Sequence, residues 1–337
     1  LVYLLCGGNK LSARMRRKMQ GVDHTMVEQL ERDYKAEKLV SFGADAVNQA
    51  RYLELYARCP VYTNTWTQYF PLGDHVFPVM LEELKRAERY IFLEYFIIGP
   101  GVFWDSIVEI LKEKHAAGVD VRIIYDDVGS LNTLPMNFAK KFEAETGIPC
   151  CFFNRFKPVI SIRMNNRDHR KFCIIDGHTA FTGGINLADE YINREMRFGH
   201  WKDSAILVKG EAAWSMTVMF LTMWEYVREV KVDYAALRPA GLPREAQLGS
   251  GYFVQPYTDN PLDNEAVGET VYLNLISKAE RYVYIMTPYL IISDCVNTAL
   301  CNAAKSGVDV RIMTPHIPDK PLVFEVTRAH YEQLLEA

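Results

Sequence analysis

The stretch RDHRKFCIIDGHTAFTGGIN brings together several side chains that are able to do chemistry. His169 and Lys171 lie two positions apart, so both side chains point to the same face of a β-strand. Asp176 follows at an Asp-Gly pair between two apolar runs, a pattern that predicts a β-hairpin. Asn186 comes after a pair of glycines, where the backbone is able to approach a ligand closely.

A histidine, a lysine and an asparagine together suit the binding of an oxyanion. Histidine supplies a nucleophile or an acid/base, lysine a point cation and asparagine a neutral donor, and phosphoryl transfer needs such positioning and charge stabilisation. Asp176 is seven positions from His169 and has the opposite parity on a regular strand. We therefore expect Asp176 to hold the hairpin or a neighbouring segment and not to contact the substrate beside His169.

The sequence offers no pattern typical of a metal site near this hairpin. No aspartate cluster accompanies it to hold Mg²⁺, and the chain contains no HExxH or HxxxH pair for zinc. We therefore expect chemistry that needs neither metal nor other cofactor. The alternative interpretation of the spacing is a surface histidine in a basic turn, with Arg167 and Arg170 as solvated neighbours.

An internal repeat organises the chain around this hairpin. AERY recurs at Ala87 and Ala279, and each copy runs through an apolar strand and a helix to reach GVDVRI, at Gly118 and Gly307. Each copy predicts a β-α-β unit with a right-handed crossover and strands buried on both faces. We expect an α/β protein made of duplicated α-β-α halves, each with a mixed, largely parallel sheet flanked by helices.

The boundaries follow from local composition. Residues 1–20 join an apolar run to five basic side chains between Lys10 and Lys18, which is typical of the cytoplasmic end of a membrane helix and its positive flank; a frayed amphipathic terminus is the alternative. Residues 21–235 form the first half and residues 236–252, rich in Pro and Gly, the linker. Residues 253–337 begin a second half, whose own motif is expected after Ala337, so we expect the sequence to be part of a longer membrane protein.

Composition narrows the class of partner. A formal net charge of −4 and a pI near 6.1 give no global attraction to nucleic acid, whose binders carry a basic domain or stripe. The segment EAAWSMTVMFLTMWEYVREV has an apolar core too short to span a bilayer, which needs roughly 20 residues. We expect it to pack as a helix within its own domain.

The hairpin resembles the signature of the phospholipase D superfamily, in which HxK is followed by four residues, D and GGxN. The matching residues here are His169, Lys171, Asp176, Gly183, Gly184 and Asn186. Surrounding segments are similar to bacterial cardiolipin synthases. They include YFPLGDHVFPVMLEELKRAERYIFLEYFII, YDDVGS, GGINLADEYI, WKDSAILVKG, VQPYTDNPLD and TPYLII, so the similarity covers the chain from about residue 35 to its end.

The resemblance implies a metal-independent transphosphatidylation. In that family a histidine attacks phosphatidylglycerol, glycerol leaves, and the hydroxyl of a second phosphatidylglycerol takes the phosphatidyl group to give cardiolipin. The two halves normally supply one histidine as nucleophile and one to protonate the leaving oxygen. Carried over, His169 is the nucleophile, Lys171 and Asn186 bind phosphate beside Gly184, and Asp176 completes the catalytic motif as support.

The resemblance also implies the setting of the reaction. The expected partners are the membrane phospholipids phosphatidylglycerol and cardiolipin, with no nucleic acid, and a homodimer stays open. The expected location is the bacterial cell membrane, with the catalytic domain on the cytoplasmic face. Two alternatives remain at this point: a phospholipase D-like phosphodiesterase with water as acceptor, and a catalytically incomplete protein that binds anionic lipid.

Overall fold

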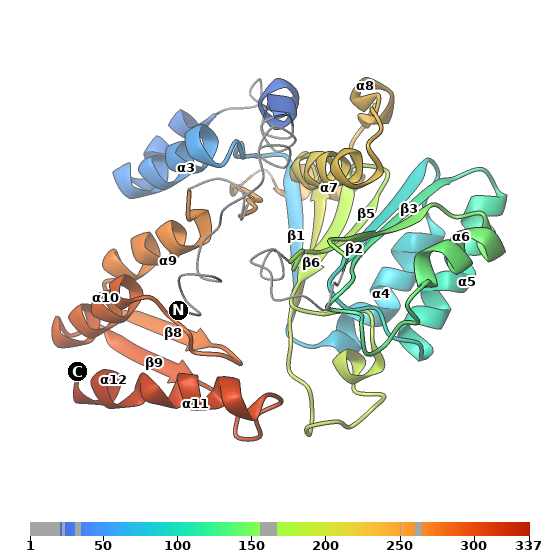
Figure 1. Ribbon diagram of the computed structural model, residues 1–337. Helices are drawn as coiled ribbons and strands as arrows, with labels where there is room; N and C mark the ends of the chain where they lie inside the picture. The colour runs from blue at the N-terminus through green and yellow to red at the C-terminus, as the bar shows by residue number, and fades with distance from the viewer. Residues whose placement is uncertain (1–20, 22–23, 31–34, 156–166, 250, 260–264) are drawn as a thin grey trace. The chain divides into compact units, whose positions relative to one another are not determined.

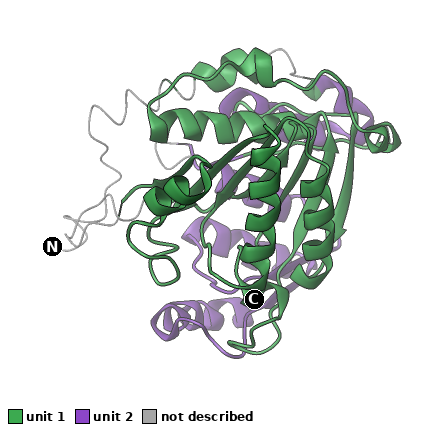
Figure 2. Ribbon diagram, turned by 90° about the vertical axis from the view of Figure 1, so that its right-hand side faces the viewer, with its two compact units in different colours: residues 1–36, 58–257, 261–263 green, residues 37–57, 258–260, 264–337 purple. Residues whose placement is uncertain are grey.

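The chain forms two compact units in a computed structural model (Figures 1 and 2). The structure describes residues 21, 24–30, 35–155, 167–249, 251–259 and 265–337. The larger unit includes residues 58–257, and the smaller includes residues 37–57 and 264–337. The expected membrane-helix end at residues 1–20 lies outside the described residues. Among the helices that are described, none combines the length and apolar character that a membrane crossing requires.

A mixed sheet forms the centre of the larger unit. Within the described residues it has seven strands in the order β1-β7-β6-β5-β2-β3-β4. The strands are β1 (Thr65–Phe70), β2 (Tyr90–Tyr95), β3 (Asp120–Asp126), β4 (Cys150–Phe153), β5 (Lys171–Ile175), β6 (Thr179–Gly183) and β7 (Ala205–Gly210). The pairs β2–β3 and β3–β4 are parallel, and the other neighbouring pairs are antiparallel.

The α/β class with a mixed sheet is therefore confirmed, although its parallel pairs are confined to one edge. A short hairpin joins β5 to β6, and such a connection makes strands antiparallel, whereas a parallel pair needs a long crossover. The helix between β2 and β3 supplies a crossover of that kind. The sheet is consequently less parallel than the repeat alone predicts.

Helices cover both faces of the sheet (Figure 1). One face carries α4 (Gly73–Lys85), α5 (Val102–Ala116) and α6 (Phe138–Thr146), and the other carries α7 (Ala212–Arg228). Leu93 of β2 belongs to the core under α4 and α5, whereas its neighbour Phe92 stacks on Phe220 of α7 with ring centroids 4.8 Å apart. This alternation agrees with strands buried on both faces. α7 is buried along most of its length, as predicted for a helix that packs within its own domain.

Shorter elements complete the larger unit. They are η4 (Asp189–Ile192), α8 (Tyr234–Leu237) and η5 (Arg244–Gly249). η5 lies within the Pro- and Gly-rich segment expected to be a linker, and it packs against β1, where Gly249 touches the backbone of Thr65. A hydrogen-bonded bridge between Tyr62 and Val254 holds the following residues to the same unit.

The smaller unit contains the second copy of the repeat. Its elements are η2 (Ala36–Phe42), α3 (Ala44–Tyr56), α9 (Val267–Ser277), β8 (Tyr282–Met286), α10 (Asp294–Lys305), β9 (Asp309–Met313), α11 (Pro321–Ala329) and α12 (Tyr331–Glu336). α3 joins this unit through polar contacts to α9, including a hydrogen bond of 2.7 Å from Asn274 to Gln49. The expected boundaries between the duplicated halves stay a prediction, because the compact units reflect packing and not the repeat.

The two copies of the repeat agree in backbone register. Tyr90 of β2 pairs with Asp120 of β3, and Tyr282 of β8 pairs with Asp309 of β9, in parallel in both units. The arginine two positions after each aspartate forms an ion pair with it, at 2.6 Å in the larger unit and 2.8 Å in the smaller. The duplicated fold predicted from the sequence is thus present at the level of single side chains.

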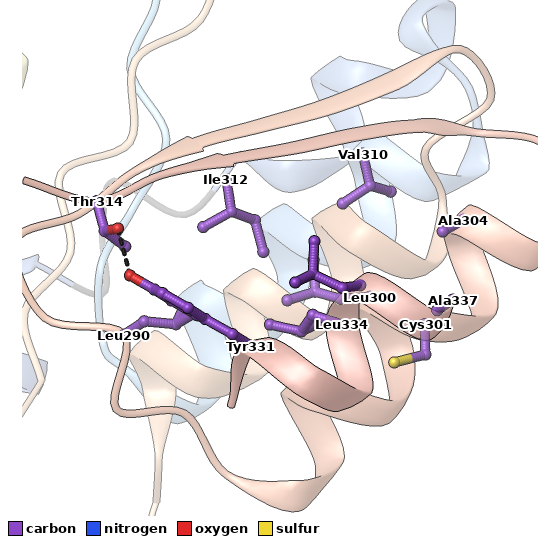
Figure 3. A pocket seen from close by; sticks show the side chains of 11 residues that line it. Leu290, Leu300, Cys301, Ala304, Val310, Ile312, Thr314, Tyr331, Leu334 and Ala337 are labelled. Atoms are coloured by element: carbon purple, nitrogen blue, oxygen red, sulfur yellow. Dashed lines mark hydrogen bonds between the residues drawn. The ribbon is translucent and has the colours of Figure 1, made fainter. Parts of the chain in front are cut away.

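An apolar cavity of about 390 Å³ lies in the smaller unit beside β9 (Figure 3). Side chains from α10, β9 and α12 line it, and the hydroxyls of Thr314 and Tyr331 meet at its edge, 2.6 Å apart. Its lining is otherwise almost wholly aliphatic, so this cavity offers no chemistry comparable to that of the hairpin.

Candidate active site

The β5–β6 hairpin forms as predicted, and its register places the candidate residues. Asp176 and Gly177 occupy the turn with φ of 54° and 72°, the left-handed region that Asp-Gly tolerates. Lys171 at the start of β5 pairs with Tyr95, the last residue of β2. Lys171 and the preceding His169 therefore lie where β2 ends, and the turn lies where β2 begins.

Asp176 binds the backbone at the far end of the hairpin. Its carboxylate accepts hydrogen bonds from the amide N–H groups of Glu88, Arg89 and Tyr90, at 2.9, 2.7 and 2.9 Å. Lys171 is five strand residues away, a separation of roughly 16 Å at about 3.3 Å per residue. Asp176 therefore fixes the hairpin to the start of β2 and does not share a site with the other motif residues.

His169 and Lys171 share an aromatic neighbour. The His169 imidazole is exposed and lies against the ring of Phe96, with centroids 4.7 Å apart and planes at 58°. The Lys171 ammonium lies 5.4 Å from the centre of the same ring and donates to the His169 carbonyl at 2.7 Å. Phe96 thus holds the exposed imidazole near a cation.

Lys171 is buried, and this burial alters its acidity. Desolvation lowers the pKa of the Lys171 ammonium to about 8. Three nearby carboxylates act in the opposite direction and raise the pKa of Lys171. In decreasing order of effect, they are Asp168, Asp203 and Asp126. At neutral pH the side chain is therefore still a cation, held in a setting of low polarity where its charge acts strongly on a bound anion.

Asn186 links the glycine pair to the end of β2. Its Oδ1 accepts from the Ile97 N–H at 3.0 Å, and its Nδ2 donates to the Tyr191 hydroxyl at 2.8 Å. An amide nitrogen carries two hydrogens, so one donor of the buried Asn186 remains for an anion. Because Ile97 follows Phe96, Asn186 is tied to the same end of β2 as His169 and Lys171.

Gly184 makes room for a carboxylate that the sequence did not single out. A Cβ at Gly184 would lie 2.0 Å from Oδ1 of Asp203, a separation that real Cβ atoms essentially never show. Asp203 is partly buried, accepts from the Ser204 N–H at 2.8 Å, and lies close enough to Lys171 for each to act on the pKa of the other. The glycine pair therefore positions a counter-charge for Lys171.

Asp126 anchors the segment that leads into β5. Its Oδ2 accepts from the Asp168 N–H at 2.9 Å, and its Oδ1 lies 3.4 Å from Nη1 of Arg167. Oδ1 also accepts from the N–H groups of Val128 and Gly129 in the turn after β3. His169 is thus carried by a backbone fixed on both sides, by Asp126 before it and by the β5–β2 pairing after it.

The structure therefore brings together His169, Lys171, Asn186 and Gly184 at one end of β2, and it places Asp176 at the other end. Three further residues contribute to the site, although they lie far from His169 and Lys171 in the sequence. Phe96 and Asp126 lie 73 and 43 residues before His169, and Asp203 lies 32 residues after Lys171. Of these, Asp126 and Asp203 carried a signal within the segments YDDVGS and WKDSAILVKG. The arrangement is suited to holding an anion beside an exposed imidazole.

The fold is that of the phospholipase D class. The structure of a phosphatidylserine synthase from Haemophilus influenzae superposes with a TM-score of 0.51 at 13% identity, covering 74% of this chain and 61% of that one. A family model described as "Cardiolipin synthase, PLD-like domain" matches residues 80–224 and 272–337. The chain belongs to this cardiolipin synthase family.

Individual relatives agree with the family model. Cardiolipin synthases from Alkalihalophilus pseudofirmus and Geobacillus kaustophilus are 31% and 33% identical over 99% and 100% of this chain. A Streptococcus mutans protein is 45% identical over 89% of it. The chain spans 64% of the length of the Streptococcus protein and 66% of each of the other two.

Proposed function

We propose that this chain carries a phosphatidyl-transfer site of a cardiolipin synthase, which joins two phosphatidylglycerol molecules and releases glycerol. The observation that carries the proposal is the exposed His169 imidazole beside the buried Lys171 ammonium, with Phe96 against both. A nucleophile and a desolvated cation at one point suit attack on a phosphodiester, because the cation stabilises charge that develops on the phosphoryl oxygens.

In the first step, a ring nitrogen of His169 attacks the phosphorus of phosphatidylglycerol. A P–N bond forms, the P–O bond to the glycerol headgroup breaks, and the glycerol oxygen leaves with a proton from a general acid. The resemblance gives this acid role to a second histidine. The product is a phosphatidyl-histidine, whose formation divides one displacement at phosphorus into two easier ones.

In the second step, a hydroxyl of another phosphatidylglycerol attacks the same phosphorus. Its proton goes to the group that acted as acid in the first step, the P–N bond breaks, and cardiolipin leaves with His169 restored. Lys171 binds the phosphoryl oxygens throughout as a cation. The free N–H of Asn186 donates to the same oxygens, and Gly184 keeps Asp203 close enough to hold Lys171 in place.

The substrate sets the proposed location. Both phosphatidylglycerol and cardiolipin are membrane lipids, so we propose that the catalytic part works at the bacterial cell membrane, on its cytoplasmic face. No cofactor is required by this scheme. A homodimer is compatible with it but has no part in the chemistry.

The test is transfer by the full-length protein on phosphatidylglycerol vesicles in the presence of EDTA. We expect cardiolipin from the wild type, none from His169→Ala, and near-normal amounts from His178→Ala. His178 is a matched control, because it lies on the same hairpin next to the Asp176 turn, where it contacts Thr179. Phosphatidic acid in place of cardiolipin would make water the acceptor, and cardiolipin formed by His169→Ala would overturn the nucleophile.

A further inference from the structure

A buried carboxyl lies behind the candidate nucleophile and takes no part in the proposed chemistry. Glu94 on β2 has an exposed fraction of 0%, and it pairs in register with Phe172 of β5. Side chains alternate along a strand, so Glu94 lies on the sheet face that α7 covers. A fully buried glutamate is rare in proteins unless it is paired, so its partners decide what it does.

The partners of Glu94 are the two residues that flank His169. Nη1 of Arg170 lies 3.3 Å from Oε1 of Glu94 and also donates to the Met219 carbonyl of α7. The carboxyl of Asp168 is also buried, with 4% exposed, and it lies close enough for its charge to raise the pKa of Glu94. The two sequence neighbours of His169, Asp168 and Arg170, therefore both lie near Glu94 of β2.

Two buried oxygens in this cluster lack a hydrogen-bond donor. Oε2 of Glu94 and Oδ2 of Asp168 accept no hydrogen bond from any group among the described residues. A buried acceptor without a donor is costly, and two buried carboxylates in contact repel each other. A proton on one of the two carboxyls removes the repulsion and supplies a donor, which is the basis of the proposal below.

Further charged groups surround Glu94 and Asp168. The carboxyls are Glu94, Asp168 and Asp126, and the guanidiniums are Arg167 and Arg170, joined by the ion pairs already described. Burial, followed by the charge of Asp168, raises the pKa of Glu94 well above its ordinary value of 4.5.

We propose that Glu94 is a positioning residue for His169, sharing a proton with Asp168 and holding Arg170, so that both neighbours of the nucleophile are fixed to β2. This role rests on the proposed function, in which His169 attacks phosphorus. Glu94 itself does not touch the substrate, because it lies under α7. The described groups that face it are Asp168, Arg170, the Met219 carbonyl and, from β4, the Cys151 thiol.

The test compares Glu94→Gln with Glu94→Leu in the full-length protein. Glutamine supplies an N–H to Asp168 and an oxygen to Arg170 without titrating, whereas leucine supplies neither. We expect kcat to fall by about 10-fold to 100-fold in Glu94→Leu, as misplacement of a reacting group does, with a smaller change in KM. Glu94→Gln should restore kcat to within about threefold of wild type.

Glu83→Gln and Glu83→Leu are the matched controls. Glu83 is also buried and ion-paired, 3.0 Å from Lys209, but Lys209 pairs with Thr179, next to the hairpin turn. Both Glu83 variants should keep the kcat of the folded protein. The rate at which diethyl pyrocarbonate modifies His169, followed by mass spectrometry, should change in Glu94→Leu alone, and this readout needs no turnover.

The pH dependence of unfolding tests the shared proton. A carboxyl with a raised pKa stabilises the fold most at low pH, and this contribution is lost as pH rises through its folded pKa. Above pH 4.5 the wild type should therefore lose stability relative to Glu94→Gln. Lys171 affects the free energy of unfolding in the opposite direction and over a different pH range. Its contribution to stability rises with pH between its folded pKa of about 8 and its ordinary pKa of 10.5.

Three results would overturn the inference: an unchanged kcat and modification rate in Glu94→Leu, a Glu94→Gln variant as impaired as Glu94→Leu, or identical pH profiles of unfolding for wild type and Glu94→Gln. Failure of the proposed function has a different signature. In that case no variant transfers phosphatidyl groups, while the modification rate and the unfolding profile still report on Glu94.

Discussion

Substitution of Asp176 tests whether this motif residue stabilises the fold or takes part in catalysis. The residue belongs to the family signature, yet its carboxylate binds three backbone N–H groups at the start of β2, roughly 16 Å along the strand from Lys171. We expect Asp176→Asn and Asp176→Ala to lower the free energy of unfolding and to leave the chemical step of the folded protein nearly unchanged.

The expected losses follow from the geometry. Asparagine keeps one acceptor, which is able to serve Arg89 and Tyr90 as Oδ1 now does, and it tolerates the left-handed φ of 54°. Losing the bond to Glu88 should cost about 2 kcal/mol, because a hydrogen bond to a charged group contributes about 1.5–3 kcal/mol. Alanine loses all three acceptor bonds and strains the backbone, so about 5 kcal/mol is expected.

Thermal unfolding followed by circular dichroism measures these losses, and transfer assays well below the midpoint measure kcat. A cost of about 5 kcal/mol approaches the whole stability of a typical domain, so Asp176→Asn is the more informative variant. We expect its kcat to stay within about threefold of wild type. A variant of wild-type stability that loses transfer by about 100-fold or more would refute this assignment.

Three further predictions concern the other end of β2. Because burial lowers the pKa of Lys171 to about 8, kcat/KM for phosphatidylglycerol should fall as pH rises through that value. In Lys171→Met, kcat/KM should be at least about 100-fold lower, and its pH–rate profile should lack this decrease. Asn186→Asp should raise KM by about tenfold or more, because a carboxylate replaces the donor to phosphate; unchanged steady-state kinetics would exclude that contact. Gly184→Ala should displace Asp203 and reduce kcat about tenfold, and a crystal structure of that variant with Asp203 in place would contradict the steric argument.

Local patterns in the sequence predict the hairpin and the duplication. The Asp-Gly turn and the two-residue spacing of His169 and Lys171 act over a few positions, and the structure contains the hairpin as β5 and β6. The parity argument separates Asp176 from His169, and the register extends that separation to opposite ends of β2. The repeated AERY and GVDVRI segments lead to strand pairs with the same register in both units.

The supporting residues could not be found in the same way. Glu94, Asp126 and Asp203 reach the hairpin through pairing and packing between segments far apart in the chain, and each looks like an ordinary acid near a strand end. The order of the strands in the sheet determines which of these carboxyls lie near the hairpin. That order depends on antiparallel pairings that no short sequence motif predicts. Likewise, α3 packs in the smaller unit through contacts such as the one from Asn274 to Gln49.

The central claim is that His169 carries the phosphatidyl group during transfer. The most direct measurement is to quench the full-length protein during turnover with ³²P-labelled phosphatidylglycerol and to locate the label by mass spectrometry of peptides. We predict an acid-labile phosphatidyl group on the peptide that contains His169, present in the wild type and in His178→Ala and absent from His169→Ala. A label on another residue, or turnover of labelled lipid by His169→Ala, would contradict the claim.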